Sequence, residues 1–241
     1  MRHVSSSRRD VRATIGVAVL LVTLVFSSGV ASASSSGRAL LKTALHHATS
    51  AGWVHETVQV KRKSVVVQDS LDYIGATEGQ QYVSGLGGAT SELIAFDQRH
   101  MLYVRANSAG LSTLYSLSST DAATYANEWL LLTPSDADYS SIAYATTLVS
   151  DFGQVRFAGA VTESGVITYA GRRVRALSGV VPAFDGAPKF GGTLYVTASG
   201  KVLPVTFVER DAKASITVSW ADWGHRYVLR APANPVDFPT S

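Results

Sequence analysis

Histidine side chains are the first residues of this chain to consider for metal binding or acid–base catalysis. His46 and His47 are adjacent on a predicted helix, about 100° apart around its axis, so they cannot clamp one metal as an i, i+4 pair does. His55-Glu56 has no second histidine three residues later. His100 and His225 lie in predicted turns. We therefore expect surface histidines and no metal site.

Nucleophile and phosphate motifs are also missing. The chain is rich in serine but has no Gly-x-Ser-x-Gly elbow, and it has no cysteine. Residues 85–90 (GLGGAT) lack the final glycine of a phosphate loop and join two predicted strands, which favours a hairpin turn. We therefore predict that the protein is not an enzyme and binds no cofactor. A secreted hydrolase whose Ser, His and acid meet only in space is the weakest of three hypotheses.

The first 33 residues have the pattern of a secretory signal peptide. Arg8, Arg9 and Arg12 precede an apolar run at residues 15–26, and Ala31-Ser32-Ala33 supplies the small residues of a cleavage site. We place cleavage after Ala33, although an uncleaved N-terminal anchor is the alternative. Of the 21 basic and 18 acidic residues, this leader (residues 1–33) holds four and one, which leaves 17 of each. The balanced remainder excludes a nucleic-acid partner. The leader itself indicates a secreted or envelope-associated protein.

Apolar periodicity predicts one helix, then a long series of strands interrupted by helices. Residues 36–50 place leucines and alanines on one helical face. Ser118 with Asp121 predicts a capped helix through Asn127, and a further helix is predicted to end at Gly153. Alternating apolar and polar residues predict strands near residues 53–60, 64–76, 80–84, 91–96, 100–105, 161–163, 173–181, 192–198, 202–208, 214–220 and 226–229.

This many antiparallel strands cannot form one flat sheet. A sheet of about ten strands must curl or close, and the inside of the curl must be filled. The sequence offers about three short helices rich in Ala, Ser and Thr, which suggests a cavity for an apolar guest. We therefore predict an α+β fold, a curled antiparallel half-barrel wrapped over a few helices. Residues 34–230 form one domain, and residues 231–241 form a proline-rich tail.

The order of these elements resembles the actinobacterial LppX/LprG-like lipoprotein family, within the wider group of LolA-like carriers. The resemblance rests on short segments: LL at 40–41, GQQ at 79–81, LYV at 102–104, YANEW at 125–129, LYVTASGKVLPV at 194–205, WG at 223–224 and AP at 231–232. It implies a half-open barrel with a hydrophobic cavity that binds acyl chains of lipids or glycolipids for envelope transport. Those relatives carry a membrane-tethering lipobox cysteine, which this chain lacks. A freely secreted or wall-associated binder is therefore expected.

Strand parity supplies the candidate cavity residues. Within each predicted strand, we expect alternate apolar side chains to face the cavity, although each of them is equally consistent with solid core. The candidates are Leu71, Tyr73, Ile94, Phe96, Leu102, Val104, Leu194, Val196, Val205 and Phe207.

The leading hypothesis is a monomeric, non-enzymatic carrier that shelters acyl chains inside the curled sheet. Each methylene group that is buried contributes roughly 0.8 kcal/mol to the binding free energy, so a long acyl chain can bind tightly without a charged anchor. The basic cluster Arg172-Arg173 with Arg175 is most simply a solvated strand edge, but it also suits transient contact with anionic headgroups. The second hypothesis is an envelope interaction or sensor module with a filled core.

Overall fold

Twelve strands form a single sheet in the computed structural model, which describes residues 33–136, 139–144, 146–153, 155–182 and 190–239. The strand order is β12-β6-β5-β4-β3-β2-β1-β11-β10-β9-β8-β7, and every pairing is antiparallel except that of β12 with β6. The strands are β1 (Trp53–Arg62), β2 (Val65–Gly75), β3 (Glu78–Gly85), β4 (Thr90–Phe96), β5 (Met101–Ala106), β6 (Leu130–Leu132), β7 (Ala158–Tyr169), β8 (Arg172–Val181), β9 (Phe190–Thr197), β10 (Pro204–Arg210), β11 (Ala214–Ala221) and β12 (Val236–Asp237).

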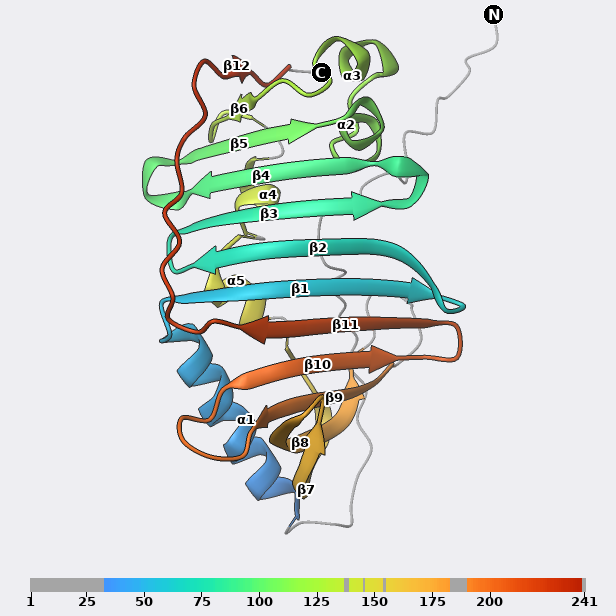
Figure 1. Cartoon of the computed structure of the whole chain (residues 1–241), viewed down its shortest axis with the longest axis vertical. Helices are drawn as coiled ribbons and strands as arrows, with labels where there is room; N and C mark the ends of the chain where they lie inside the picture. Colours follow the sequence, from blue (N-terminus) through green and yellow to red (C-terminus); the bar gives the residue numbers. More distant parts are fainter. Residues whose placement is uncertain (1–32, 137–138, 145, 154, 183–189, 240–241) are drawn as a thin grey trace, which may run out of the picture.

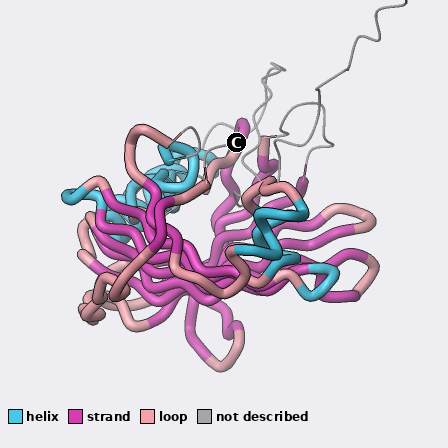
Figure 2. Tube along the Cα trace, turned by 90° about the horizontal axis from the view of Figure 1, so that it is seen from above, coloured by secondary structure: helices cyan, strands magenta, loops and turns pink. Residues whose placement is uncertain are grey.

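The sheet is curled and open, with β12 and β7 as its edges (Figure 1, Figure 2). This confirms the predicted α+β half-barrel, with two short strands, β6 and β12, beyond the main series. The predicted last strand at residues 226–229 is wrong, because the described chain has no strand there. The predicted leader falls on residues 1–33, of which 1–32 lie outside the described residues.

Five α-helices accompany the sheet in the described ranges: α1 (Ala33–Thr49), α2 (Ser108–Leu114), α3 (Ser119–Thr124), α4 (Tyr139–Tyr144) and α5 (Leu148–Gly153). The predicted N-terminal helix and the Ser118 cap are confirmed, since the Ser118 side chain accepts a hydrogen bond from the Asp121 amide. Helix α2 escaped prediction because its sequence, SAGLSTL, is poor in helix-forming residues. Its start is fixed by Asn107, whose side chain accepts a hydrogen bond from the Gly110 amide.

The expected helix that ends at Gly153 is two helices, α4 and α5, interrupted near Thr146. Thr147 forms an isolated parallel bridge with Gly75, and the Thr146 side chain donates a hydrogen bond to the carbonyl of Ala143. The backbone therefore leaves the helical path to pair with the edge of β2. The periodicity of apolar residues in the sequence cannot predict this contact, because it is made with a distant part of the chain.

Two apolar clusters lie on the inner face of the sheet, which we define as the face that contacts α1, α4 and α5. The α1 cluster joins α1 and α5 to β1 and β7–β11, with Val54, Phe152 and Leu194 among its buried members. The α2 cluster joins α2, α3 and α4 to β4–β6, with Leu102 and Leu111 among its buried members. The inner face is therefore apolar at both ends of the sheet, and a strip between the two clusters contains polar side chains.

The C-terminal segment crosses the opposite, outer face of the sheet. In Figure 1 it is the dark red coil that runs from β11 past β1–β5 to β12. The Tyr227 ring lies 4.0 Å from the Tyr73 ring and 6.0 Å from the Trp53 ring, measured between centroids. Farther along, Leu229 packs against the outer-face cluster of Ile94, Phe96 and Tyr103. Side-chain packing thus holds residues 226–229 on the sheet without strand pairing.

Candidate functional site

The ten predicted cavity residues occupy both faces of the sheet. Six of them are buried on β5, β9 and β10: Leu102 and Val104 in the α2 cluster, Leu194, Val196 and Phe207 in the α1 cluster, and Val205 beside the latter. The other four, Leu71, Tyr73, Ile94 and Phe96, point to the outer face, where Ile94 and Phe96 pack with Tyr103 and Tyr73 contacts Tyr227. The structure therefore divides the predicted residues among the α1 cluster, the α2 cluster and the outer face of the sheet.

Strand register explains this division. Ile94 pairs with Tyr103, while the partner of Val104 is Leu93, so Ile94 and Val104 lie on opposite faces. Side chains alternate faces within a strand, and a shift of one residue exchanges the faces of the whole strand. The sequence shows which residues of one strand share a face, but it does not show which of those faces lies on the same side of the sheet as a face of the neighbouring strand.

A row of polar residues separates the two apolar clusters on the inner face. Glu56 of β1 pairs with Asp72 of β2, and Asp72 pairs with Gln81 of β3. Beyond this row, Gln81 pairs with Leu93 of the α2 cluster, and Glu56 pairs with Trp220 of the α1 cluster. We call the strip that contains Glu56, Asp72 and Gln81 the seam.

Three carboxyl groups meet at the seam. Glu56 and Asp72 are each only 2% exposed. Glu56 Oε2 accepts a hydrogen bond of 2.6 Å from Trp220 Nε1, and Glu56 shares a side-chain hydrogen bond with Asp151 of α5. Asp72 Oδ2 accepts hydrogen bonds from Gln81 Nε2 at 3.1 Å and Ser70 Oγ at 3.4 Å. Helix α5 is thus fixed to the sheet partly through acidic groups.

Burial changes the protonation of these groups. Desolvation raises the pKa of Glu56 well above its ordinary value, and the nearby Asp151 and Asp72 carboxyls raise it further. Desolvation likewise raises the pKa of Asp72 to about 7 and that of Asp151 to about 6. A buried acid keeps its proton because the charged form has lost its water and has no cation beside it. The Glu56–Asp151 pair therefore shares a proton.

These acids were not among the sequence candidates, although the sequence contains a signal for them. Glu56 lies between Val54 and Val58, and Asp72 lies two residues before Ile74, so both occupy inward positions of their strands. An acidic residue in an otherwise apolar inward series indicates a buried polar contact. Within the described ranges, no three His, Cys, Asp or Glu side chains are arranged to hold a metal ion.

The indole of Trp220 is expected to be a stability determinant of the seam. Replacing Trp220 with Phe removes the donor to Glu56 and leaves a buried carboxyl oxygen without that partner, at a cost of about 1–3 kcal/mol. Trp223→Phe is the matched control, because both rings pack on Phe152, with centroids 5.2 and 5.5 Å away. Urea unfolding of both variants measures the difference. Equal losses would show that only ring packing matters at Trp220.

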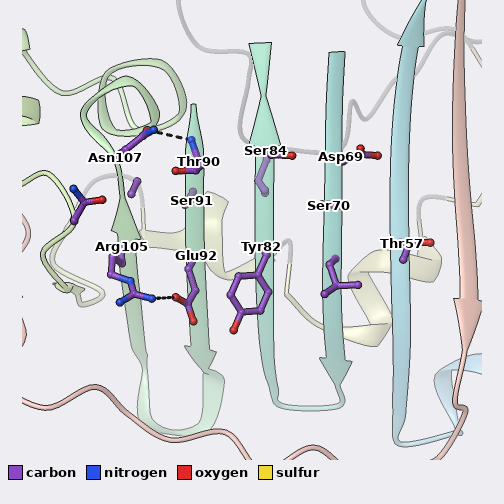
Figure 3. Close-up of a pocket in the computed structure, with 14 residues that line it drawn as sticks. Thr57, Asp69, Ser70, Tyr82, Ser84, Thr90, Ser91, Glu92, Arg105 and Asn107 are labelled. Atoms are coloured by element: carbon purple, nitrogen blue, oxygen red, sulfur yellow. Dashed lines mark hydrogen bonds and ion pairs between the residues drawn. The ribbon is translucent and has the colours of Figure 1, made fainter. Parts of the chain in front are cut away.

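A groove of about 650 Å³ lies on the outer face across β1–β5 (Figure 3). Its lining is mostly polar: Thr57, Asp69, Ser70, Leu71, Tyr82, Val83, Ser84, Thr90, Ser91, Glu92, Arg105, Ala106, Asn107 and Asn127. The Arg105 guanidinium donates to Glu92 Oε2 at 2.5 Å and lies 4.8 Å from the centre of the Trp129 ring. Gln80 Nε2 donates to the other oxygen of Glu92 at 2.9 Å. The Glu92 and Arg105 charges of the groove are therefore paired with each other, while the Asp69 carboxylate accepts a hydrogen bond from the neutral Gln59 side chain.

Comparison with known proteins supports the fold. No family model matches the chain, and no curated protein matches it. The crystal structure of LprF from Mycobacterium bovis is similar with a TM-score of 0.55 and 14% identity, over 83% of this chain and 99% of that one. The crystal structure of the Mycobacterium tuberculosis lipoprotein LppX is similar with a TM-score of 0.53 and 13% identity, over 81% and 99%. The resemblance to LppX/LprG-like proteins is therefore confirmed at the level of the fold.

Proposed function

We propose that the protein is an exported, non-enzymatic carrier that holds the acyl chains of a lipid or glycolipid against the inner face of its curled sheet. One observation carries the proposal: an open half-barrel with the fold of LprF and LppX presents apolar side chains on its inner face from both ends of the sheet. Each methylene buried there contributes about 0.8 kcal/mol, so a long alkyl chain binds without a charged anchor.

We place the acyl chain along the seam, between the two apolar clusters. The inner members of the predicted set, Leu102, Val104, Leu194, Val196, Val205 and Phe207, then form the two walls behind it. Val83 of β3 is half-buried. It faces inward because it pairs with Ser70, which in turn pairs with Val58 of the α1 cluster. On its other side, Val83 pairs with Ser91. The four outer-face members, Leu71, Tyr73, Ile94 and Phe96, have no part in this arrangement.

Export is part of the proposal. The leader is removed after Ala33, and the mature chain remains outside the cytoplasm as a monomer. In the described ranges, no helix combines the length and apolar character that crossing a membrane requires. The intact mass of the protein purified from a mycobacterial host measures the processing site directly.

Lipid content tests the carrier function. Protein exported by a mycobacterial host is extracted with organic solvent, and the extract is analysed by mass spectrometry for acylated molecules in stoichiometric amount. Val83→Trp is expected to reduce the load severalfold, because the indole occupies the inner face directly beside the seam. Ser84→Trp is the matched control, since the neighbouring Ser84 lies on the outer face and is exposed. Folded wild-type protein without extractable lipid would contradict the proposal.

The second candidate is a non-enzymatic interaction or sensor module with a filled core. A specific observation favours it: Leu102, Val104, Leu194 and Val196 are each at most 1% exposed and pack within the two clusters. On this alternative the seam is closed by α5 and admits no alkyl chain. The extraction experiment separates the two, because a filled core yields no lipid from either the wild type or the Val83 variant.

A further inference from the structure

Two neighbouring hairpin turns project from the ends of four central strands of the sheet. The β1–β2 hairpin turns at Lys63 and Ser64, and the β10–β11 hairpin turns at residues 211–213. The Lys63 amide donates a hydrogen bond of 2.9 Å to the carbonyl of Lys213, and Arg62 pairs with Ala214, so the two turns touch. Figure 1 shows both turns at the right-hand end of their strands. We call residues 61–66 and 210–214 the basic tips.

The basic tips concentrate positive charge at one place on a chain whose residues after the leader carry equal numbers of basic and acidic side chains. They contain five basic residues and one acidic residue: Lys61, Arg62, Lys63, Arg210, Lys213 and Asp211. Asp211 is committed to its own turn, where its Oδ1 accepts hydrogen bonds from the backbone amides of Lys213 and Ala214 at 2.6 and 2.5 Å. The Arg and Lys side chains at 62, 63, 210 and 213 are exposed. The basic tips therefore present Lys and Arg side chains that no acidic residue of the same two turns neutralises.

Exposed apolar side chains accompany this charge. Val65 is 62% exposed and Val66 is 41% exposed, and only Ser64 separates them from the Lys-Arg-Lys run of the same hairpin. Single exposed apolar residues are ordinary, but two adjacent valines at the end of a charged hairpin match an amphipathic surface. Such a surface suits a medium that is anionic at its boundary and apolar beneath it.

The position of the basic tips relative to the inner face agrees with this chemistry. Val60 pairs with Ile216, and both are partly buried against the α1 cluster. They precede and follow the two turns by only a few residues, so the apolar inner face extends almost to the tips. A membrane in contact with the tips thus lies at one end of the inner face.

We propose that the basic tips dock the protein on an anionic membrane surface, with the Lys and Arg side chains on lipid phosphates and the valines at the headgroup boundary. This docking does not depend on the carrier function, because it uses exposed residues outside the seam. Each basic residue near an anionic bilayer contributes about 1 kcal/mol, and added salt screens the attraction.

The experiment measures sedimentation of the exported, full-length product with phosphatidylcholine vesicles, with and without phosphatidylglycerol. Lys61→Gln combined with Arg62→Gln and Lys63→Gln is expected to weaken binding to the anionic vesicles about 100-fold. Lys42→Gln combined with Lys201→Gln and Arg230→Gln is the matched control, since these three exposed basic residues lie on α1, in the β9–β10 turn and in the C-terminal segment, and not on the basic tips. Every variant has the same N-terminus, so differences between variants report the tips alone. Circular dichroism verifies that each variant is folded.

The outcomes are distinct. Selective loss in the Lys61/Arg62/Lys63 variant supports the proposal, as does weaker binding when Val65 and Val66 are replaced by Ser. Equal binding of that variant and the wild type, or an equal loss in the Lys42/Lys201/Arg230 control, overturns it. Polyglutamate is tested as a soluble polyanion. Competition by polyglutamate together with no effect of the valine replacements would show that the tips bind an acidic polymer instead of a membrane. Lipid extraction of the same variants keeps this result separate from the carrier function.

Discussion

The protein is expected to lose stability as the pH rises from about 4 to about 7, because three buried carboxyl groups at the seam hold their protons in the folded state. In the unfolded chain the same groups ionise near pH 4. Between these values the folded state binds more protons than the unfolded state, so raising the pH favours unfolding. The stabilisation is complete below the unfolded pKa values and is lost as the pH rises toward the folded ones.

The expected effect is large compared with the stability of a typical domain. The pKa of Asp72 is raised from 3.8 to about 7, which corresponds to a loss on the order of 4 kcal/mol across the window. Asp151 acts in the same direction, and so does Glu209, whose pKa burial raises to about 7. The neighbours that contact the seam acids, Ser70, Gln81 and Trp220, are neutral and cannot offset the charge.

Glu56→Gln tests the origin of this dependence. The glutamine carbonyl still accepts from Trp220 and its amide still donates to Asp151, but no proton can be lost at that position. We expect the variant to be more stable than the wild type at pH 8 and similar to it at pH 4.5. Glu92→Gln is the control, because Glu92 lies on the outer face and is paired with Arg105. Guanidinium unfolding at both pH values measures the effect, and an unchanged pH slope in Glu56→Gln would refute the assignment.

Local sequence signals predicted the fold well where the contacts that stabilise an element lie within it. The amphipathic pattern of α1 and the Ser118 cap are local, and both were found. The break between α4 and α5 depends on the bridge from Thr147 to Gly75, more than 70 residues earlier in the chain, and was missed. Residues 226–229 alternate like a strand because they pack one face against Tyr73 and Ile94, not because they pair with a neighbour.

The candidate site was less predictable than the fold because it depends on relations between strands. Alternation identified Leu102 and Val104 as facing one side and Leu71 and Tyr73 as facing one side, but it did not relate the two pairs. The seam acids were overlooked because acidic residues in a strand are normally assigned to solvent. The available evidence was that Glu56, between Val54 and Val58, and Asp72, two residues before Ile74, occupy the inward-facing positions of their strands.

Replacing Gly79 with Ala is the second change with a large expected effect. A Cβ at Gly79 would lie 2.6 Å from the carbonyl oxygen of Thr146, which is closer than real Cβ atoms come to backbone oxygen. The backbone that joins α4 and α5 must therefore move away from β3, at a cost of about 1–3 kcal/mol or more. Gly85→Ala is the control on the same strand, because a Cβ there meets nothing within 4 Å. It should be neutral or stabilise by about 0.4–1 kcal/mol through the unfolded chain.

Thermal unfolding of both variants measures this contact, and lipid content links it to function. Thr146 precedes α5 by two residues, and α5 carries Asp151 onto the seam, so a displaced Thr146 loosens the helix that covers the proposed acyl chain. We expect Gly79→Ala to lower both the melting temperature and the retained lipid, and Gly85→Ala to lower neither. If Gly79→Ala melts early but retains its full lipid load, then α5 stabilises the sheet without covering the ligand. The acyl chain would then lie away from the seam acids, on the α1 or the α2 cluster.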